Sequence, residues 1–455
     1  MTTGHPFSAP VPASPGGEPA VAVVGAGWAG LAAAVELARA GVAVTVYEAA
    51  AIPGGRARRV LHAGAALDNG QHLLLGAYRE TLRLVALVTD PARVLHRQPL
   101  RLVSGSGFRL ACPPLPAPLH LLAGLLGARG LSWADRLAAV RFMARARRAG
   151  FRAPPGATVS ALLQAWGHTP ALTRHLWEPL CLSALNTPLD EADATTFLAV
   201  LRDGLTRARA DADLLLPRAD LSQVFPEPAV RFVSDHGGQV RLGCAVTGLH
   251  RDGTSLRVES AAGRATFRHV ILAADPVRAG RLLQGLSGAE SAERAIDALA
   301  HEPITTVYLR LAAPGAGLGE AMLGDEAGPA QWFFDRERLC GQAGWVAGVV
   351  SASSAWRSRG HELLAAAVHA QLQALTGRAP ALLDQFVVSE RRATFRCVPG
   401  LERPGLDTGV PGLLLAGDYV RSEYPATLEA AVRSGVACAH RVLQSSQTHP
   451  SRQAA

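Results

Sequence analysis

Three glycines near the start of the chain have the spacing of a phosphate-binding turn. Gly25, Gly27 and Gly30 follow a short apolar run at 21–24. The first glycine of such a turn permits the sharp bend, the second leaves room for a pyrophosphate against bare backbone, and the third lets helix and strand pack closely. Glu48, about 20 residues on, has the position of a carboxylate that binds ribose hydroxyls. The pattern predicts a dinucleotide site.

A second set of residues, partly at the far end of the chain, fits the same ligand. Gly55 and Arg56 follow the first site, whereas Gly417 and Asp418 end an apolar run near the C-terminus. Asp418 could reach a ribityl or phosphate group, and a helix beginning near Thr427 would aim its N-terminus at a flavin ring. A simple NAD site needs only the local strand–helix unit. Two contacts so far apart in the chain therefore predict FAD.

A cluster of polar side chains is the candidate for acid–base chemistry. Asp68, Asn69, Gln71 and His72 stand together and precede a leucine run at 73–75. A loop of this kind can line a cofactor ring while it faces an apolar substrate. Histidine titrates near neutrality and can move a proton there. The alternative is an Asx-type turn with a structural histidine.

The elements that must position these residues predict an α/β fold. A strand at 21–24, a helix to about Arg39 and a strand at 42–47 begin a Rossmann-type, glutathione reductase-like FAD-binding domain. Further runs predict a β-meander at 240–274, an antiparallel sheet from 304–311, 344–351 and 386–395, a helix at 361–375 on that sheet, and a mainly helical insertion at 79–220. The meander leads back to the main sheet of the FAD-binding domain, whereas the antiparallel sheet, its helix and the insertion belong to a discontinuous α+β substrate domain.

The predicted domains are assembled from separate stretches of the chain. We expect a disordered leader at 1–19, an FAD-binding domain from 20–75, 221–300 and 396–445, a substrate-binding domain from 76–220 and 301–395, and a flexible tail at 446–455.

Composition narrows the class of protein. Of the 455 residues 49% are hydrophobic and the mean hydropathy is +0.15, yet no stretch gives the about 18 apolar residues of a transmembrane helix. The six cysteines are scattered without metal-ligand spacing, which predicts reduced thiols, a cytoplasmic protein and no metal. The net charge is +8 and every fixed side-chain cation is arginine, but no nucleic-acid-binding module occurs.

One stretch raises the hypothesis of a peripheral membrane contact at the inner face of the cytoplasmic membrane. Arg141, Arg145, Arg148 and Arg152 fall on one stripe of a helix that follows an apolar segment at 115–126. A basic amphipathic helix of this kind can lie on an anionic bilayer. The alternative is an ordinary solvated face.

With these motifs in place, the sequence resembles the FAD-dependent amine oxidase and phytoene desaturase superfamily. More narrowly it is similar to the squalene-associated FAD-dependent desaturases, the hydroxysqualene dehydroxylases of bacterial hopanoid synthesis. The resemblance spans about 20–443 and is carried by the motifs GAGWAGL, GGRA and LAGD and, more specifically, by LDNGQHLLLGAYRET, WEPLCLSALNTPL, ITTVYL, QWFFDR, RRATFRCVPG and AGDYVRSEYPATLEAAVRSG.

The resemblance implies a reaction and a set of cofactor residues. Reduced FAD would remove the allylic hydroxyl of hydroxysqualene, a long apolar isoprenoid, with other enzymes of squalene synthesis as partners. By match to the family pattern the FAD-binding residues are Gly25, Gly27, Gly30, Glu48, Gly55, Arg56, Val246, Gly417, Asp418, Thr427 and Leu428. The resemblance places Val246 on the adenine side, and Thr427 and Leu428 beneath the flavin ring. The resemblance to the family indicates no particular catalytic side chain in this sequence. Our hypothesis is that Asp68, Gln71 or His72 assists the loss of hydroxide.

Three other functions compete with this one. An oxidative desaturase or isomerase of a carotenoid-type polyene would use the same fold with electrons flowing from substrate to FAD. An amine oxidase is disfavoured because lysine is absent and aromatic residues make up only 5%, whereas many such enzymes have a lysine near the flavin and an aromatic cage. A non-catalytic lipid carrier would be colourless and gain no stability from FAD.

Overall fold

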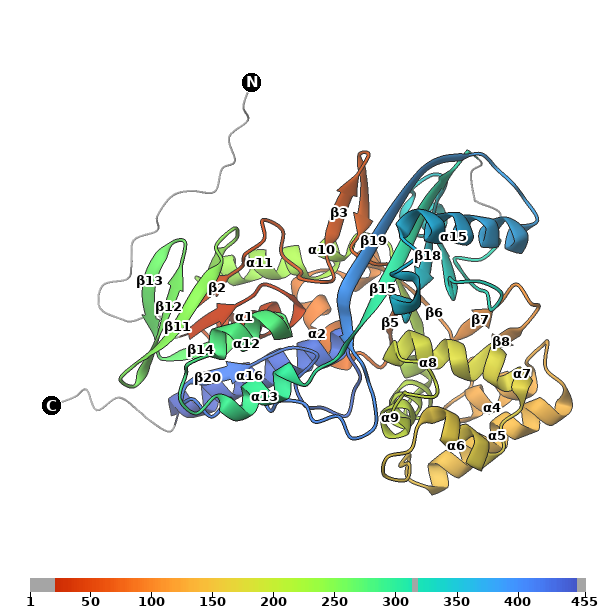
Figure 1. The fold of residues 1–455 in the computed structure, drawn as a ribbon, viewed down its shortest axis with the longest axis horizontal. Coiled ribbons are helices and arrows are strands. Elements are labelled where there is room, and N and C mark those ends of the chain that lie inside the picture. Colours follow the sequence, from red (N-terminus) through yellow and green to blue (C-terminus); the bar gives the residue numbers. More distant parts are fainter. Residues whose placement is uncertain (1–20, 313–317, 448–455) are drawn as a thin grey trace.

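The computed structural model describes residues 21–312 and 318–447. The predicted leader at 1–19 and residues 448–455 of the predicted tail lie outside the described residues. The first two residues of that predicted tail, 446 and 447, belong to the last helix. Figure 1 shows two sheets side by side, with a helical region below the second one. The limits of the two predicted domains stay a prediction.

A five-stranded parallel sheet forms one half of the molecule, as predicted. All neighbouring strands of this sheet pair in parallel. The strand at 21–24 runs into the glycine-rich turn at 25–30, and the strand at 44–47 precedes Gly54 and Gly55. In spatial order the strands are β10 (Gln239–Arg241), β2 (Val44–Tyr47), β1 (Val21–Val24), β14 (His269–Leu272) and β20 (Leu413–Leu415). The second strand begins at Val44, two residues later than predicted. Buried valines, leucines and isoleucine make these strands suitable for a sheet covered on both faces.

Helices cover this sheet and pack on one another. The C-terminal helix lies against the first helix, and that helix also contacts a later one from the middle of the chain. The helices of this half are α1 (Trp28–Arg39), α2 (Arg79–Val88), α3 (Pro91–Val94), α10 (Leu221–Val224), α11 (Pro226–Asp235), α12 (Pro276–Leu283), α13 (Glu290–Asp297) and α16 (Leu428–Gln447). A Cβ at Gly435 would lie 2.0 Å from the carbonyl oxygen of Ala29, so the close contact between α16 and α1 requires this glycine.

The predicted meander and antiparallel sheet are both present. The meander consists of β11 (Val246–Asp252), β12 (Ser255–Ser260) and β13 (Gly263–Phe267). The antiparallel sheet has the order β16 (Met322–Gly324), β17 (Trp332–Asp335), β18 (Trp345–Val350), β15 (His301–Leu311) and β19 (Leu382–Phe395). It is accompanied by α14 (Arg336–Cys340), η3 (Ser353–Trp356) and α15 (His361–Thr376), the last of which packs on β15 and β19. The strands β16 and β17 were not predicted.

The insertion at 79–220 is less helical than predicted. Its helices are α4 (Leu119–Leu126), α5 (Trp133–Arg148), α6 (Val159–Trp166), α7 (Pro170–Leu172), η1 (Thr173–Trp177), α8 (Glu178–Leu185), α9 (Ala194–Leu205) and η2 (Arg209–Ala212). Small sheets also occur in and before it: β3 (Arg59–His62) with β4 (Ala65–Asp68), β5 (Leu74–Leu75) and β6 (Leu95–Gln98) with β9 (Leu214–Pro217), and β7 (Arg101–Val103) with β8 (Arg109–Ala111). Because β6 and β9 pair across more than a hundred residues, local periodicity could not reveal them.

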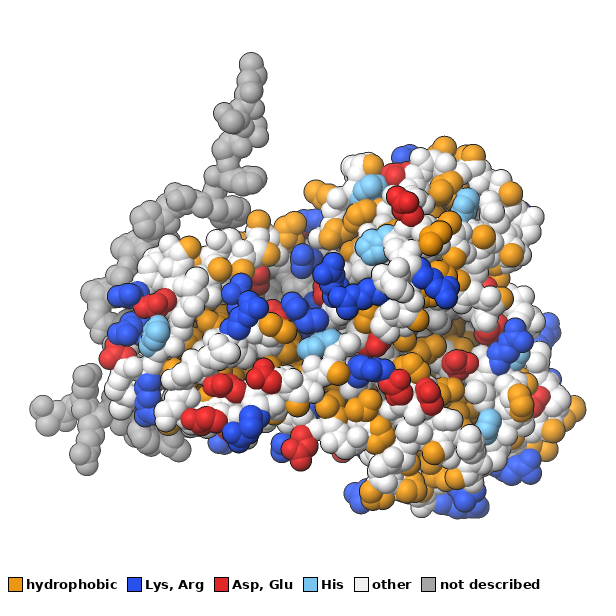
Figure 2. Space-filling view, viewed as in Figure 1, with side chains coloured by type: hydrophobic (Ala, Val, Ile, Leu, Met, Phe, Trp, Pro, Cys, Tyr) orange, Lys and Arg blue, Asp and Glu red, His pale blue; other side chains and the backbone are white. Residues whose placement is uncertain are grey.

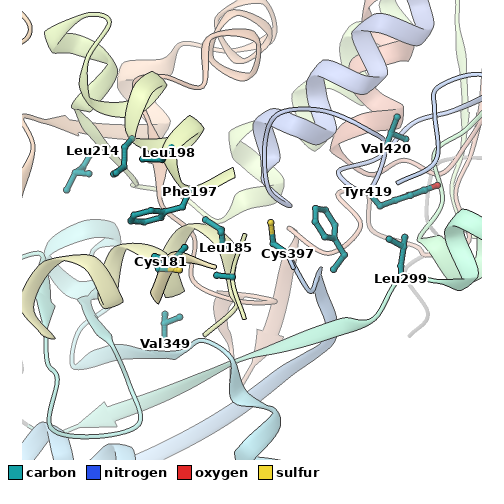
Figure 3. Packing of buried hydrophobic residues seen from close by; sticks show 14 of the residues in the cluster. Cys181, Leu185, Phe197, Leu198, Leu214, Leu299, Val349, Cys397, Tyr419 and Val420 are labelled. Carbon is teal, nitrogen blue, oxygen red and sulfur yellow. The ribbon is translucent and has the colours of Figure 1, made fainter. Parts of the chain in front are cut away.

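The largest hydrophobic core connects the insertion to the C-terminal part of the chain. Figure 3 shows Leu185 and Phe197 from α8 and α9 near Cys397, with Tyr419 further along the same cluster. This continuity holds the helical region in a fixed place relative to the strand β20 and the loop that follows it.

Candidate functional site

A single large cavity joins the predicted cofactor residues. Its volume is about 660 Å³, and it extends from the glycine-rich turn to the helices of the insertion. The predicted cofactor residues that line it are Gly25, Gly27, Glu48, Gly55, Arg56, Val246, Gly417, Asp418, Thr427 and Leu428. The remaining one, Gly30, is buried behind the turn, where the structure gives it a packing role.

Two glycine backbones face each other at one end of the cavity. Gly27 precedes α1, has no side-chain cap, and is bridged to Gly54 as in a parallel ladder. Gly55, with φ at +61°, lies so close that a Cβ there would be 3.2 Å from the Cα of Gly27. The first N–H groups of α1 thus remain available beside bare backbone. This is the environment that a pyrophosphate requires.

Gly25 and Gly30 make this turn sterically feasible. Gly25 has φ at +109°, and a Cβ on it would meet the carbonyl oxygen of Ala273 at 2.6 Å. A Cβ on Gly30 would lie 2.0 Å from the carbonyl oxygen of Gly25. Helix, turn and the neighbouring strand are therefore in backbone contact, which is the role predicted for the third glycine.

Glu48 connects the second strand to this turn. It follows β2, and its Oε2 accepts the N–H of Ala26 at 2.7 Å while Oε1 accepts that of Ala50 at 2.8 Å. The carboxylate is held at the cavity wall with acceptor capacity to spare. It is suitably placed for the hydroxyls of an adenosine ribose. Val246, the first residue of β11, lines the same cavity.

An ion pair joins the two distant segments. Arg56 Nη2 lies 2.5 Å from Asp418 Oδ1, across 362 positions of sequence. The other terminal nitrogen of Arg56 donates to the carbonyl of Ala393 at 2.6 Å. Burial works against the Arg56 cation, but the carboxylate of Asp418 outweighs it and raises the Arg56 pKa above its ordinary value. The segments at 55–56 and 417–418 therefore form one continuous wall.

The N-terminus of α16 adds a further set of N–H groups. Thr427 precedes the helix, and its Oγ1 accepts the N–H of Ala430 at 3.2 Å, so Thr427 acts as an N-cap. Leu428 begins the helix and lines the cavity. Taken together, these residues fit FAD: two helix N-termini, an acid for the ribose and glycine backbones for the phosphates share one cavity.

The three candidate acid–base residues have different positions. Gln71 and His72 line the cavity, whereas Asp68 does not. His72 Nδ1 donates to the carbonyl of Gly70 at 2.7 Å, which leaves Nε2 as the acceptor in the neutral ring. Burial lowers the pKa of His72 below its ordinary 6.5, so the neutral ring predominates at pH 7.

Asp68 belongs to a buried network behind Gln71. Arg336, only 1% exposed, donates from Nη1 to Gln71 Oε1 at 2.6 Å and lies 3.5 Å from Asp68 Oδ2. Asp68 Oδ1 also accepts the N–H of Leu221 at 2.7 Å. Burial raises the pKa of Asp68 to about 6, although the nearby Arg336 cation acts in the opposite direction. Asp68 can thus act on the cavity only through Arg336 and Gln71.

The rest of the cavity is mainly apolar. It is lined by side chains from the insertion and from the antiparallel sheet, which include Leu180, Phe197, Leu201, Met322 and Phe334. The cavity is therefore polar along the predicted cofactor segments and mainly apolar beyond them, with Asp203 as a charged residue of the insertion in its wall. A mainly apolar wall fits a hydrocarbon substrate.

Sequence reasoning missed Arg336 and two carboxylates. Arg336 follows the buried strand β17, and an arginine two positions after the apolar run WFF was an available signal. Glu429 accepts the N–H and hydroxyl of Thr81, and Asp203 accepts the hydroxyl of Tyr424 at 2.8 Å; both carboxylates line the cavity. Their partners lie hundreds of residues away, so no local pattern marked them.

The described residues hold no group of three or more His, Cys, Asp or Glu side chains arranged for a metal ion. Within the same residues, no helix combines the length and the apolar character needed to cross a membrane. All six cysteines are free thiols.

The fold and the FAD-fitting wall define a class, the flavoprotein oxidoreductases. The model of the family "flavin containing amine oxidoreductase" matches residues 28–443, so the chain belongs to this family and is an FAD-dependent oxidoreductase. The structure is similar to an oxidoreductase from Methanosarcina mazei, with a TM-score of 0.73 at 17% identity over 92% of this chain and 99% of that one. This confirms the predicted fold class.

Within that class the sequence is similar to particular enzymes. It is 30% identical to the hydroxysqualene dehydroxylase of Rhodopseudomonas palustris over 93% of this chain and 98% of that protein. The enzyme of the same name from Sinorhizobium fredii is 28% identical over 94% of this chain and 99% of that protein. The 15-cis-phytoene desaturase of Synechococcus elongatus is 24% identical over 93% and 95% of the two chains. The resemblance expected from the motifs is confirmed.

Proposed function

We propose that this protein catalyses the reductive dehydroxylation of hydroxysqualene to squalene. The observation that carries the proposal is a single cavity whose wall fits FAD and whose remaining surface is mainly apolar, with Gln71 and His72 among its lining residues. Full-length similarity to hydroxysqualene dehydroxylases supports the choice of substrate.

The overall change can be written so that atoms and electrons balance. The carbon–oxygen bond of the allylic alcohol breaks, a carbon–hydrogen bond forms at the allylic system, and the hydroxyl leaves as water after taking up a proton. When bound, reduced FAD supplies the hydride and is oxidised by two electrons. The protein must therefore assist the departure of hydroxide and keep water from recapturing the carbon.

Gln71 and His72 are the side chains that we assign to the hydroxyl. Arg336 holds the Gln71 carbonyl oxygen, so the orientation of the Gln71 amide is fixed by a buried cation. In its protonated form His72 can donate through Nε2, because Nδ1 already donates to Gly70. Only the imidazolium can give a proton to the leaving hydroxide. The apolar lining excludes water from the same space.

Product analysis under anaerobic conditions tests the proposal. The protein is incubated with hydroxysqualene and dithionite-reduced FAD, and the lipids are extracted for mass spectrometry. We expect squalene, a product one oxygen lighter, in amounts equal to the FAD oxidised. Unchanged hydroxysqualene from protein that retains FAD would contradict the proposal.

The competing reaction is oxidative desaturation of a polyene. The similarity to 15-cis-phytoene desaturase favours it as the second candidate. Incubation of the oxidised protein with phytoene separates the two, because a desaturase would yield a product two hydrogens lighter and leave hydroxysqualene untouched.

A further inference from the structure

Exposed apolar side chains concentrate on the helical hairpin α4–α5. The described residues include ten large hydrophobic side chains that are exposed, and five of them lie between residues 115 and 137. They are Leu115, Leu119, Leu122, Trp133 and Leu137, and Trp133 is 66% exposed. A group of this size on one hairpin marks an interaction surface rather than scattered exposure.

The exposed side chains follow the periodicity of the two helices. On α4, Leu119 and Leu122 are exposed while Leu121 and Leu125 are buried in the core. On α5, the exposed residues Trp133, Leu137, Arg141, Ala144 and Arg148 recur every three or four positions and therefore share one face. Three other residues of this helix, Ala134, Arg145 and Arg147, are also exposed. The two helices pack on each other, and Arg136 donates to the carbonyl of Leu126 across them at 3.0 Å. We call the exposed faces of α4 and α5 the hairpin surface.

The charge of the hairpin surface is strongly positive. Residues 113–152 contain seven arginines and a single acidic residue, Asp135. That carboxylate is buried in a capping box with Ser132 and does not offset the exposed cations. Figure 2 shows hydrophobic and basic side chains close together at the lower right, where Figure 1 draws α4, α5 and α6.

The structure corrects the basic stripe predicted from sequence. Arg145 turns toward α6, where it donates to the carbonyl of Ala165 and lies over the ring of Trp166. Arg152 lies beyond the end of α5 at Arg148. Arg141 and Arg148 remain on the same face as Trp133 and Leu137, so the face is apolar at its N-terminal half and basic at its C-terminal half.

The hairpin surface lies one layer away from the cavity. α4 packs on β8, β8 pairs with β7, and Leu102 of β7 lines the cavity. The buried side of α4 belongs to the same hydrophobic core as the substrate wall.

We propose that the hairpin surface docks on a bilayer that contains anionic lipids. Leucines and a tryptophan would enter the boundary between headgroups and acyl chains, while Arg141 and Arg148 would contact anionic headgroups. A symmetric dimer through this surface would gather the arginines of two copies in one interface, and residues 113–152 offer no exposed carboxylate to pair with them, so charge repulsion opposes it. The proposal goes beyond the proposed reaction, and its test needs no turnover.

Vesicle flotation of the FAD-loaded, full-length protein tests the proposal. The vesicles contain either equal parts of phosphatidylglycerol and phosphatidylcholine or phosphatidylcholine alone. We expect binding to the anionic vesicles, weakened by salt, and at least about tenfold weaker binding for W133S/L137S and for R141Q/R148Q. The matched control is L363S/L383S, two leucines 62% and 59% exposed on α15 and β19, which should bind like the unsubstituted protein.

Three results would overturn the proposal. They are absence of binding to either vesicle, binding by both hairpin variants that is as strong as that of the unsubstituted protein, and a dimer in light scattering that W133S/L137S converts to monomer without any vesicle binding. Flavin absorbance and thermal unfolding report whether each variant folds. If W133S/L137S does not fold, the comparison of vesicle binding between R141Q/R148Q and the unsubstituted protein decides whether the proposal holds.

Discussion

At the scale of single residues, a buried cation connects the polar side of the cavity to the interior. Arg336 contacts Gln71 on the cavity and Asp68 behind it, and it lies over the ring of Tyr308, 5.4 Å from the centroid. The hydroxyl of Tyr308 donates in turn to the carbonyl of Asp68 at 3.0 Å. Removal of any one member would leave a buried polar group without its partner, which costs more than the pair contributes.

The Arg336 cation can be tested by substitution. We expect Arg336→Gln to lower the free energy of unfolding by about 3–5 kcal/mol, because the Asp68 carboxylate loses its buried counter-charge. Arg338→Gln on the same helix is the matched control and should change it by less than about 0.5 kcal/mol, because Arg338 is exposed. Chemical denaturation measures both. Equal stability of the two variants would contradict the network.

Asp68 gives stability a pH dependence of defined sign. Its folded-state pKa is raised by burial from 3.8 to about 6, so between these values the folded state keeps a proton that the unfolded state has lost. The free energy of unfolding should therefore fall as pH rises from about 4 to about 6, by on the order of 2–3 kcal/mol, and this contribution should level off above. Denaturation curves of Asp68→Asn should lack this component. A variant with an unchanged pH slope would refute the assignment.

His72 gives the reaction rate a pH dependence. Burial holds its pKa below 6.5, so the imidazolium fraction grows as pH falls below neutrality. If this cation donates to the leaving hydroxide, single-turnover oxidation of reduced FAD by hydroxysqualene should accelerate on acidification, approaching tenfold per pH unit above the pKa. His72→Gln should flatten the profile and slow the reaction at acid pH. A profile unchanged by this variant would remove His72 from the mechanism.

At the scale of secondary structure, the contact between α1 and the glycine-rich turn determines the shape of the cofactor wall. The carbonyl of Gly25 lies where a side chain of Gly30 would be, and the helix begins there without a side-chain cap. Backbone alone thus forms this part of the wall.

Gly30→Ala should therefore disrupt FAD binding. A methyl group 2.0 Å from the carbonyl oxygen of Gly25 must push helix and turn apart, and we expect at least about 100-fold weaker FAD binding by flavin fluorescence titration. The control is Gly280→Ala on α12, where the nearest atom would be 3.4 Å away and affinity should stay within about twofold. Equal affinity of both variants would contradict the steric role of Gly30.

Sequence patterns predicted those elements that depend on local periodicity. The strand–turn–helix of β1 and α1, the meander β11–β13 and the long strands β15 and β19 have such patterns, although β15 starts at His301 and β19 at Leu382, earlier than expected. The strands β16 and β17 have three and four residues and the pair β6–β9 forms across the insertion, so tertiary contact determines them. Arg336 escaped prediction for the same reason, because its burial depends on segments far away in the chain.

At the scale of the whole molecule, the two ends of the chain meet at one ligand site. The strands β1 and β20 lie in the same sheet, separated by β14, and the loop after β20 returns to the turn after β2. The ion pair between Arg56 and Asp418 joins these two segments directly. The antiparallel sheet and the insertion then extend the same cavity with apolar side chains, which separates the polar cofactor wall from the substrate region.

The central claim is that both ends of the chain bind one FAD molecule, and a double-mutant cycle of FAD affinity tests it most directly. Isothermal titration of the apoprotein should give one FAD per chain, with Arg56→Met and Asp418→Asn each weakening binding by about tenfold or more and a coupling of about 1–3 kcal/mol in the double variant. Strict additivity, or an Asp418→Asn variant that binds FAD as tightly as the unsubstituted protein, would contradict the claim.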